Sequence, residues 1–245
     1  MKYTALSRKG CAMQDEMWAL VYDKSRDVWE KSKGLRKVKV KKPVIDEAKD
    51  PMDACRVIVK VIYTGFCGSD RGIWFRNSFK GMIYSSLKAE KKTARIIGHE
   101  LLGEVVEVGV LARERYGYKA KDIVSTESHI ICGKCKQCLI GDTHVCSDEQ
   151  IIGITRDGCF AEYIKLPAEV LWRTNTKLIR NKVACLQEPF GNAVHACTKV
   201  DLRGKSVAIF GCGTIGLFAI LVAKALGASK IIGIEPNVKN ANKAL

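Results

Sequence analysis

Four cysteines within one short stretch constrain this chain more than any other feature. Cys132, Cys135 and Cys138 follow one another at intervals of three residues, and Cys146 comes eight residues later. From a single loop, four thiolates can surround one zinc ion tetrahedrally and leave no coordination position for a substrate. A disulfide pair or an iron–sulfur cluster is the alternative, and His144 offers a competing ligand. The pattern predicts a structural zinc site made by the four cysteines.

Composition places the chain among globular proteins. Its 245 residues are 47% apolar and 27% charged, which suits a chain with a real core. No apolar run reaches the ~20 residues of a membrane span, and the first residues lack the apolar stretch of a secretory signal. We therefore expect a cytoplasmic protein without membrane contact. Disulfides are rare in that compartment, so six scattered cysteines are expected to be reduced thiols: Cys11, Cys55, Cys159, Cys185, Cys197 and Cys212.

The formal charge of +15, from 41 basic and 26 acidic residues, raises the question of a nucleic-acid partner. The basic residues are dispersed, and the densest run, KVKVKK (37–42), alternates in the way of an edge strand with a solvated face. No aromatic residues interleave with this run, as base stacking requires. The pattern favours a solvated strand, so we expect a small-molecule partner and no nucleic acid.

Most of the chain has the alternation of short β-strands. Residues 1–16 resemble an N-terminal extension, and the regular pattern begins at Met17. An Asp157-Gly158 pair predicts a turn before the last strand of this half. Together the strands predict an all-β, barrel-like domain. They are expected at 17–23, 56–63, 101–110, 122–126 and 160–166.

The period changes in the last quarter of the chain. Residues 182–199 have helical spacing, interrupted at Glu188-Pro189. From Gly204 a buried strand, a glycine turn, a helix over 214–226 and a second buried strand form one βαβ unit. A complete doubly wound α/β domain has about six strands. We therefore expect the chain to be the front part of a longer enzyme and to be inactive alone.

The glycine turn has the pattern of a dinucleotide-binding site. Gly211, Gly213 and Gly216 follow a buried strand and open a helix, with Glu235 at the end of the next strand. The glycines permit a tight turn and close approach of a pyrophosphate to the helix N-terminus. Glu235 would bind the ribose hydroxyls and repel a 2′-phosphate, so NAD is expected rather than NADP. A glycine-rich packing turn is the alternative. The expected cofactor contacts are Gly211, Gly213, Thr214, Ile215, Gly216 and Glu235.

A second set of possible metal ligands is spread along the chain. Cys67, His99, Glu100 and Glu188 offer one thiolate, one imidazole and two carboxylates, which suits a catalytic zinc with an exchangeable position. Each residue alone is more typical of a core or a hydrogen-bonded side chain. Zinc would polarise an alcohol and lower its pKa. Ser69, two residues after the cysteine, could then accept the hydroxyl proton.

An ordered set of motifs resembles the zinc-containing medium-chain dehydrogenases. The motifs are GFCGSD, GHELLGEVVEVG, CGKCKQC followed by Cys146, DGCFAEY and GCGTIG. The resemblance implies a GroES-like β-barrel catalytic domain over 17–189, with the zinc lobe at about 127–150. An incomplete Rossmann domain over 190–245 follows, which makes the fold class α/β plus all-β. The family is usually homotetrameric.

The resemblance also implies roles for particular residues. Cys67, His99 and Glu188 would bind catalytic zinc, with Glu100 as a nearby, exchanging ligand, so that each chain holds two zinc ions. His129 falls where the family places a substrate-pocket histidine. The segments ESHIICGKC, GDTHVC and QEPFGNAVHA are most similar to the L-threonine-oxidising group. Sorbitol- or butanediol-type polyol dehydrogenases and a non-catalytic zinc-binding protein with the same fold are the alternatives.

The chain departs from the family at the proton path. Five residues after the catalytic cysteine the family often has a histidine that relays the alcohol proton to water, and here that position is Gly72. The segment between 75 and 95 is also lengthened and basic. The resemblance therefore implies a zinc- and NAD-dependent oxidation of a secondary alcohol whose proton leaves by a different route.

Overall fold

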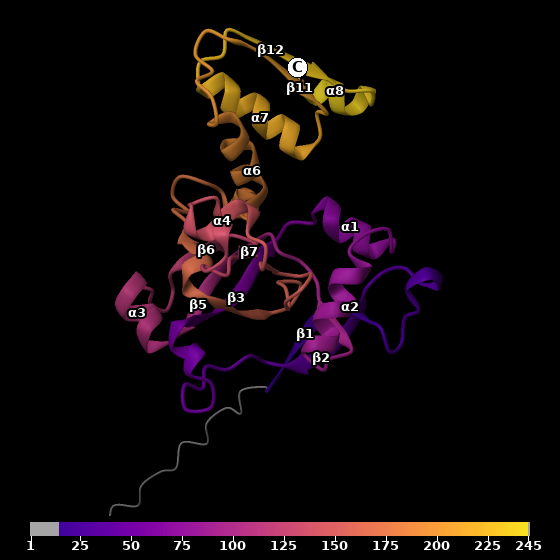
Figure 1. The fold of residues 1–245 in the computed structure, drawn as a ribbon, viewed down its shortest axis with the longest axis vertical. Helices are drawn as coiled ribbons and strands as arrows, with labels where there is room; N and C mark the ends of the chain where they lie inside the picture. Colours follow the sequence, from indigo (N-terminus) through magenta and orange to yellow (C-terminus); the bar gives the residue numbers. More distant parts are fainter. Residues whose placement is uncertain (1–14, 245) are drawn as a thin grey trace, which may run out of the picture.

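The structure, a computed structural model, describes residues 15–244. Figure 1 shows a β-rich body, to which helix α6 connects a smaller unit built from β11, α7, β12 and α8. The predicted extension at 1–16 lies mostly outside the described residues. Its last residue, Glu16, already belongs to the first strand.

Three strands form the first sheet, in the order β2-β1-β4. They are β1 (Glu16–Asp23), β2 (Arg36–Lys41) and β4 (Ala94–Ile96). The basic strand β2 lies at the edge, as its alternation predicts, and no residue in it is buried. Trp18 of β1 lies between Lys37 and Lys39, whose ammonium nitrogens are 4.6 and 4.5 Å from the ring centroid. The basic run contains no aromatic residue of its own, and the neighbouring strand β1 places the Trp18 ring against its lysines.

Five antiparallel strands form the larger sheet, in the order β10-β6-β5-β3-β9. They are β3 (Arg56–Thr64), β5 (Leu101–Val108), β6 (Ile123–Thr126), β9 (Tyr163–Pro167) and β10 (Leu171–Arg173). Fully buried Val57, Val59, Leu101 and Leu166 supply its core. Strands β10 and β9 form the two edges of this sheet, so strand pairing among the described residues does not close it into a barrel.

Two local expectations for this half are wrong. The strand expected over 101–110 ends at Val108, and a short helix, α3 (Val110–Tyr116), follows. Asp157-Gly158 forms no turn, and the turn of this segment lies earlier, at 153–155. Gly158 packs against Gly98, because a Cβ on Gly158 would lie 2.2 Å from the Gly98 carbonyl oxygen. Glycine at 158 thus permits a close backbone contact with a segment sixty positions earlier in the chain, and turn propensity gives no information about such a contact.

Short helices and 3-10 turns connect the strands of the two sheets. The helices are α1 (Gly68–Trp74), α2 (Lys80–Ala89), α4 (Lys136–Leu139) and α5 (Asn181–Ala184). The 3-10 turns are η1 (Trp29–Lys31), η2 (Pro51–Cys55), η3 (Thr143–Val145) and η4 (Ala168–Val170). A two-stranded ladder pairs β7 (His129–Ile130) with β8 (Gln150–Ile151) at the base of the cysteine loop.

The predicted βαβ unit is present. Parallel strands β11 (Ser206–Phe210) and β12 (Lys230–Ile234) are joined by α7 (Thr214–Ala225), and α8 (Val238–Ala244) follows. The helix α6 (Gln187–Cys197) leads into the unit and packs against α7 through Phe190 and Phe218. Pro189 lies in the first turn of α6, where no intrahelical donor is needed.

Within residues 15–244 the structure contains no helix of the length and apolarity that crossing a membrane requires.

Candidate metal and cofactor sites

One group of buried ligand-type side chains lies where β3 ends and β5 begins. Ligand atoms of Cys67, His99 and Glu100 lie within 4.8 Å of one another. Cys67 is the N-cap of α1, and the other two residues precede β5. Gly65 makes room for the glutamate, because a Cβ there would lie 1.8 Å from the Glu100 carboxylate. Cys67 is thus brought together with His99 and Glu100, which follow it by more than thirty positions of sequence.

The charge state of this group suits a cation. Although burial alone would lower it, hydrogen bonding to Cys67 and the Asp70 carboxylate raise the pKa of His99 to about 9. Hydrogen bonding to the same imidazole lowers the pKa of the Cys67 thiol. The pair therefore favours a thiolate beside an imidazolium. A metal ion binds a thiolate and a neutral imidazole, so a bound ion would replace the imidazolium proton.

Two buried atoms at this group have no hydrogen-bond partner among residues 15–244. They are His99 Nδ1 and Asp70 Oδ1, which lie 3.6 Å apart. The other Asp70 oxygen accepts from the backbone N–H of Cys67 at 2.9 Å. Metal-bound histidines usually donate their second ring N–H to a carboxylate, which sets the tautomer and orients the ring. A metal ion on the other face of the imidazole therefore fits the residues present.

The structure places Glu188 in a second group beside the first. Its carboxylate lies with Glu127 and His129, again with ligand atoms within 4.8 Å. Ser128 donates its hydroxyl to Glu188 at 2.6 Å, and His129 Nδ1 lies 3.1 Å from Glu127. Among the described residues, the compact group around Cys67 contains Glu100 rather than Glu188.

Sequence reasoning identified neither Glu127 nor Ser128. The signal was present, since residues two apart in an extended segment point to the same side. Glu127 precedes His129 by two positions. Ser69 lies where it was expected, with its hydroxyl 3.4 Å from His99 Nε2.

The four cysteine sulfurs of the loop between β7 and β8 form the third group. Cys132, Cys135, Cys138 and Cys146 all lie within 4.8 Å of one another. The sulfurs of Cys135 and Cys146 are 3.9 Å apart, too far for a disulfide. Two sulfurs bound tetrahedrally to one zinc at about 2.3 Å would be about 3.8 Å apart. His144, the competing ligand, lies instead against the ring of His195, with centroids 4.8 Å apart.

Because the four sulfurs lie close together, the pKa values of two of the thiols shift in opposite directions. Backbone N–H groups of Cys138 and Ser147 lower the pKa of Cys135 to about 5. Burial and hydrogen bonds with neighbouring sulfurs raise the pKa of Cys138 to about 12. A divalent cation at the centre would stabilise all four as thiolates. The donor set and its spacing therefore fit zinc.

The glycine turn between β11 and α7 has room for a phosphate. Gly211 has a φ of +90°, and a Cβ on Gly216 would lie 1.8 Å from its carbonyl oxygen. Gly213 caps α7 and has no atom within 4 Å of a built Cβ, so the helix N-terminus, which begins with Thr214 and Ile215, is open. Glu235 accepts from the backbone N–H of Cys212 at 2.8 Å. The carboxylate therefore lies at the turn, as the fingerprint predicts.

Comparisons with known proteins agree with this arrangement. The family model "Alcohol dehydrogenase GroES-like domain" matches residues 53–176. A GroES-like domain with a four-cysteine loop and a Cys–His–Glu group defines a class, and the chain belongs to it: the zinc-dependent medium-chain alcohol dehydrogenases.

Similar proteins include an L-threonine 3-dehydrogenase from Caldanaerobacter subterraneus, 43% identical over 180 residues. That match covers 74% of this chain and 49% of the relative, so the chain spans about half the length of the curated relative it matches. Among solved structures, a protein from Sinorhizobium meliloti described as a zinc-binding dehydrogenase bound to NADP has 25% identity and a TM-score of 0.76. It covers 94% of this chain and is itself covered to 59%. The 2R,3R-butanediol dehydrogenase from Bacillus subtilis has 25% identity, a TM-score of 0.73 and coverages of 93% and 60%.

Proposed function

We propose that this protein oxidises a secondary alcohol by hydride transfer to NAD, with L-threonine as the preferred substrate and 2-amino-3-oxobutanoate as the product. The buried group of Cys67, His99 and Glu100 carries the proposal, together with the unpartnered imidazole nitrogen beside Asp70. The similarity to L-threonine 3-dehydrogenases supports the choice of substrate.

Two zinc ions per chain are part of the proposal. Cys67, His99 and a carboxylate, from Glu100 or Glu188, would hold the catalytic ion. The structural ion would lie among the four cysteines of the loop between β7 and β8. The catalytic ion would supply Lewis-acid polarisation of the alcohol oxygen.

The domain division follows the expectation from sequence. We assign residues 17–189 to a GroES-like domain that contains the zinc lobe, and residues 190–245 to the start of a Rossmann domain. The turn at Gly211–Gly216 would hold the pyrophosphate, and Glu235 the ribose hydroxyls. A 2′-phosphate would meet the Glu235 carboxylate, and bringing like charges together is unfavourable. We also propose that the complete protein is a homotetramer located in the cytoplasm.

The substrate pocket would be formed partly by the group around His129. Glu127 and Glu188 place two carboxylates there, next to the proposed catalytic centre. Negative charge at this position suits the ammonium group of an amino acid and offers nothing specific to a neutral diol. This observation favours threonine over butanediol. The similarity to a butanediol dehydrogenase keeps the polyol reaction as the second candidate.

The test of the proposed function is enzymatic. The protein is expressed from its complete gene, loaded with zinc, and supplied with L-threonine, sorbitol or 2,3-butanediol and either NAD or NADP. We expect NADH formation to be fastest with L-threonine and NAD. Turnover of none of the three alcohols would reject the enzymatic role in favour of a non-catalytic zinc-binding protein.

Glu127→Gln should raise the KM for L-threonine while leaving that for butanediol unchanged. The lost ion pair with the substrate ammonium is worth about 1 kcal/mol at a half-exposed carboxylate, which is roughly a fivefold change. Glu114→Gln, on the exposed side of α3, is the matched control. Equal changes for both alcohols would mean that Glu127 acts through the fold and not through the substrate.

The proton path provides a second prediction. Ser69 would take the alcohol proton, and Gly72 supplies no imidazole to pass it on, so turnover should rise as the pH becomes alkaline. A side chain at Gly72 would meet Ser78, whose Oγ and Cβ would lie 2.9 and 3.0 Å from a built Cβ. Gly72→His alone is therefore expected to be crowded, and Ser78→Gly in addition makes room.

We expect the double variant, Gly72→His with Ser78→Gly, to raise turnover at pH 7 and to flatten the pH profile. General acid–base assistance is typically worth roughly 10²-fold or more, and less where water substitutes. Ser78→Gly alone is the control for the space created. A wild-type profile already flat between pH 6 and 9 would show that another group relays the proton.

A further inference from the structure

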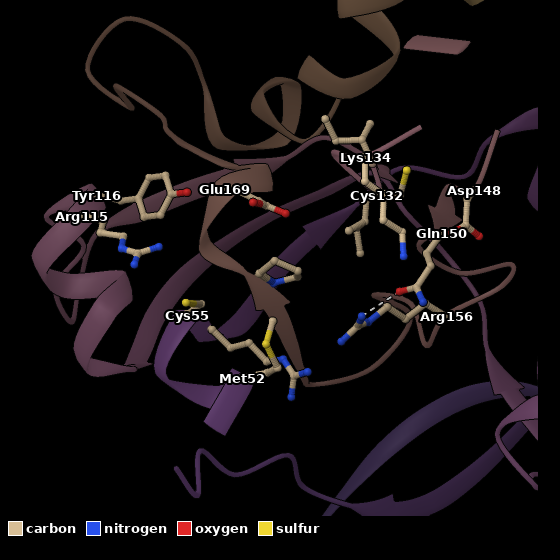
Figure 2. A pocket seen from close by; sticks show the side chains of 14 residues that line it. Met52, Cys55, Arg115, Tyr116, Cys132, Lys134, Asp148, Gln150, Arg156 and Glu169 are labelled. Atoms are coloured by element: carbon tan, nitrogen blue, oxygen red, sulfur yellow. Dashed lines mark hydrogen bonds between the residues drawn. The ribbon is translucent and has the colours of Figure 1, made fainter. Parts of the chain in front are cut away.

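A hollow that Ile130 of β7 lines, but His129 does not, has no part in the proposed reaction. It has a volume of about 560 Å³ and lies between η2, α3 and the base of the cysteine loop. In Figure 2, Arg156 and Gln150 form one wall, and Arg115 and Tyr116 enter from α3 at the opposite side. This volume is in the range of small-molecule sites.

Positive charge on the lining exceeds negative charge. Arg115, Lys134 and Arg156 have no ion-pair partner among residues 15–244, whereas Arg56 is paired with Asp50 and Asp53. Within the described part of the chain, the carboxylates of the lining that lack an ion-pair partner are Asp148 and Glu169. Three free cations therefore face two free carboxylates.

Arg156 is the half-buried cation of the lining that lacks a counter-ion among residues 15–244. Its guanidinium is half-buried, and its one hydrogen bond among the described residues goes to a neutral group, Gln150 Oε1, at 2.9 Å. Burial, and next the charge of Arg56, lowers its pKa. A half-buried cation without a counter-ion is unfavourable, and an oxyanion can accept two parallel hydrogen bonds from one guanidinium.

A second hollow shares the same wall. It has a volume of about 790 Å³, lies beside β2 and β4, and is also lined by Gln150 and Arg156. Lys41 and Lys91 line it without an ion-pair partner in the described part of the chain. The acidic residues of this lining, Glu90 and Asp157, are both bound by Lys92 and Arg95. Unpaired positive charge thus continues on both sides of Arg156.

The other walls of the first hollow are apolar. Met52, Ile130 and Pro167 line it, with the ring of Tyr116 beside them. We propose that this hollow binds a small organic anion, whose phosphate or carboxylate group is held by Arg156 and whose apolar body lies against Met52, Ile130 and Pro167. Arg115 and Lys134 supply further charge at the rim.

The test is isothermal titration of the purified, zinc-loaded protein with phenyl phosphate, benzoate, inorganic phosphate and phenol. We expect one saturable site for phenyl phosphate or benzoate, and weaker binding of inorganic phosphate and phenol, which each lack half of the ligand. The ratio of phenyl phosphate to benzoate affinity identifies the oxyanion that the site prefers. A higher salt concentration should weaken the binding.

Arg156→Gln should weaken the preferred anion roughly 10- to 100-fold, because it removes a charge-assisted hydrogen-bonding group. The affinity of Arg156→Lys should lie between those of the wild type and Arg156→Gln, since lysine keeps the charge and loses the planar, two-donor guanidinium. Arg203→Gln removes an exposed arginine from the βαβ unit and should change nothing. Arg115 and Lys134 are exposed, and Arg115→Gln and Lys134→Gln should each weaken binding a few-fold. These two variants test the proposal if Arg156→Gln does not fold.

The proposal is wrong if no anion of this set binds saturably at millimolar concentration. It is equally wrong if Arg156→Gln, Arg115→Gln and Lys134→Gln all bind as the wild type does, or if Arg203→Gln weakens binding as much as they do. The last result would mean that the net charge of the chain, and not this hollow, attracts the anion.

Discussion

Cys67→Ser should remove one of two zinc ions and lower kcat/KM for the alcohol by roughly 10³-fold, because Lewis-acid stabilisation by a bound metal is worth several kcal/mol. The cysteine lies beside His99 and Glu100, and hydrogen bonding to the imidazole lowers the pKa of its thiol, so we expect it to be the strongest ligand of the proposed site. Serine keeps the shape and offers no thiolate.

The measurement is zinc content by atomic emission together with NADH formation by the zinc-loaded protein. Cys55→Ser is the control, because Cys55 lies outside the three ligand groups. The thermal midpoint should change little in either variant. If the wild type holds one zinc ion per chain and Cys67→Ser keeps it, Cys67 does not bind a catalytic ion, and the four-cysteine loop is the one zinc site.

Cys135→Ser should destabilise the protein more than a change in the same loop that removes no sulfur. Losing a structural metal is among the few mechanisms that cost on the order of 4 kcal/mol, or roughly 10 °C in thermal midpoint for a chain of this size. The loop itself is two short turns, α4 and η3, on a two-residue ladder, and none of the residues in those turns is buried. Little besides the ion would therefore hold it together.

The matched control is Leu139→Ser, a change in the same loop at a side chain that is 74% exposed. It should keep both zinc ions and the wild-type midpoint. Chelation of the wild type with EDTA should reproduce the lower midpoint of Cys135→Ser. If Cys135→Ser retains two zinc ions and melts with the wild type, the four sulfurs do not bind the structural ion.

Motifs whose residues are close in sequence were predictable. The four cysteines fall within one loop, and local spacing alone brings their sulfurs within 4.8 Å. The glycine turn, its helix and the edge position of β2 also follow from short patterns, because a tight turn, a helix start and an alternating strand are set by neighbouring residues. Cys67 and His99 were grouped by their ligand chemistry and by the resemblance, since their spacing alone gives no reason to join them.

Contacts between distant segments were decided by the tertiary structure. Glu127 and Ser128 join Glu188 across sixty positions, and Trp18 comes to the lysines of β2 from the neighbouring strand. The hollow around Arg156 is enclosed by residues from η2, α3, β7 and β8, and no sequence pattern connects these. The sequence by itself determined the local ligand loops and the βαβ unit, because their geometry is set within a few bonds of the backbone. Which charges stay unpaired, and which carboxylate lies nearest the Cys67 sulfur, depends on how the packed sheets place loops that are far apart along the chain.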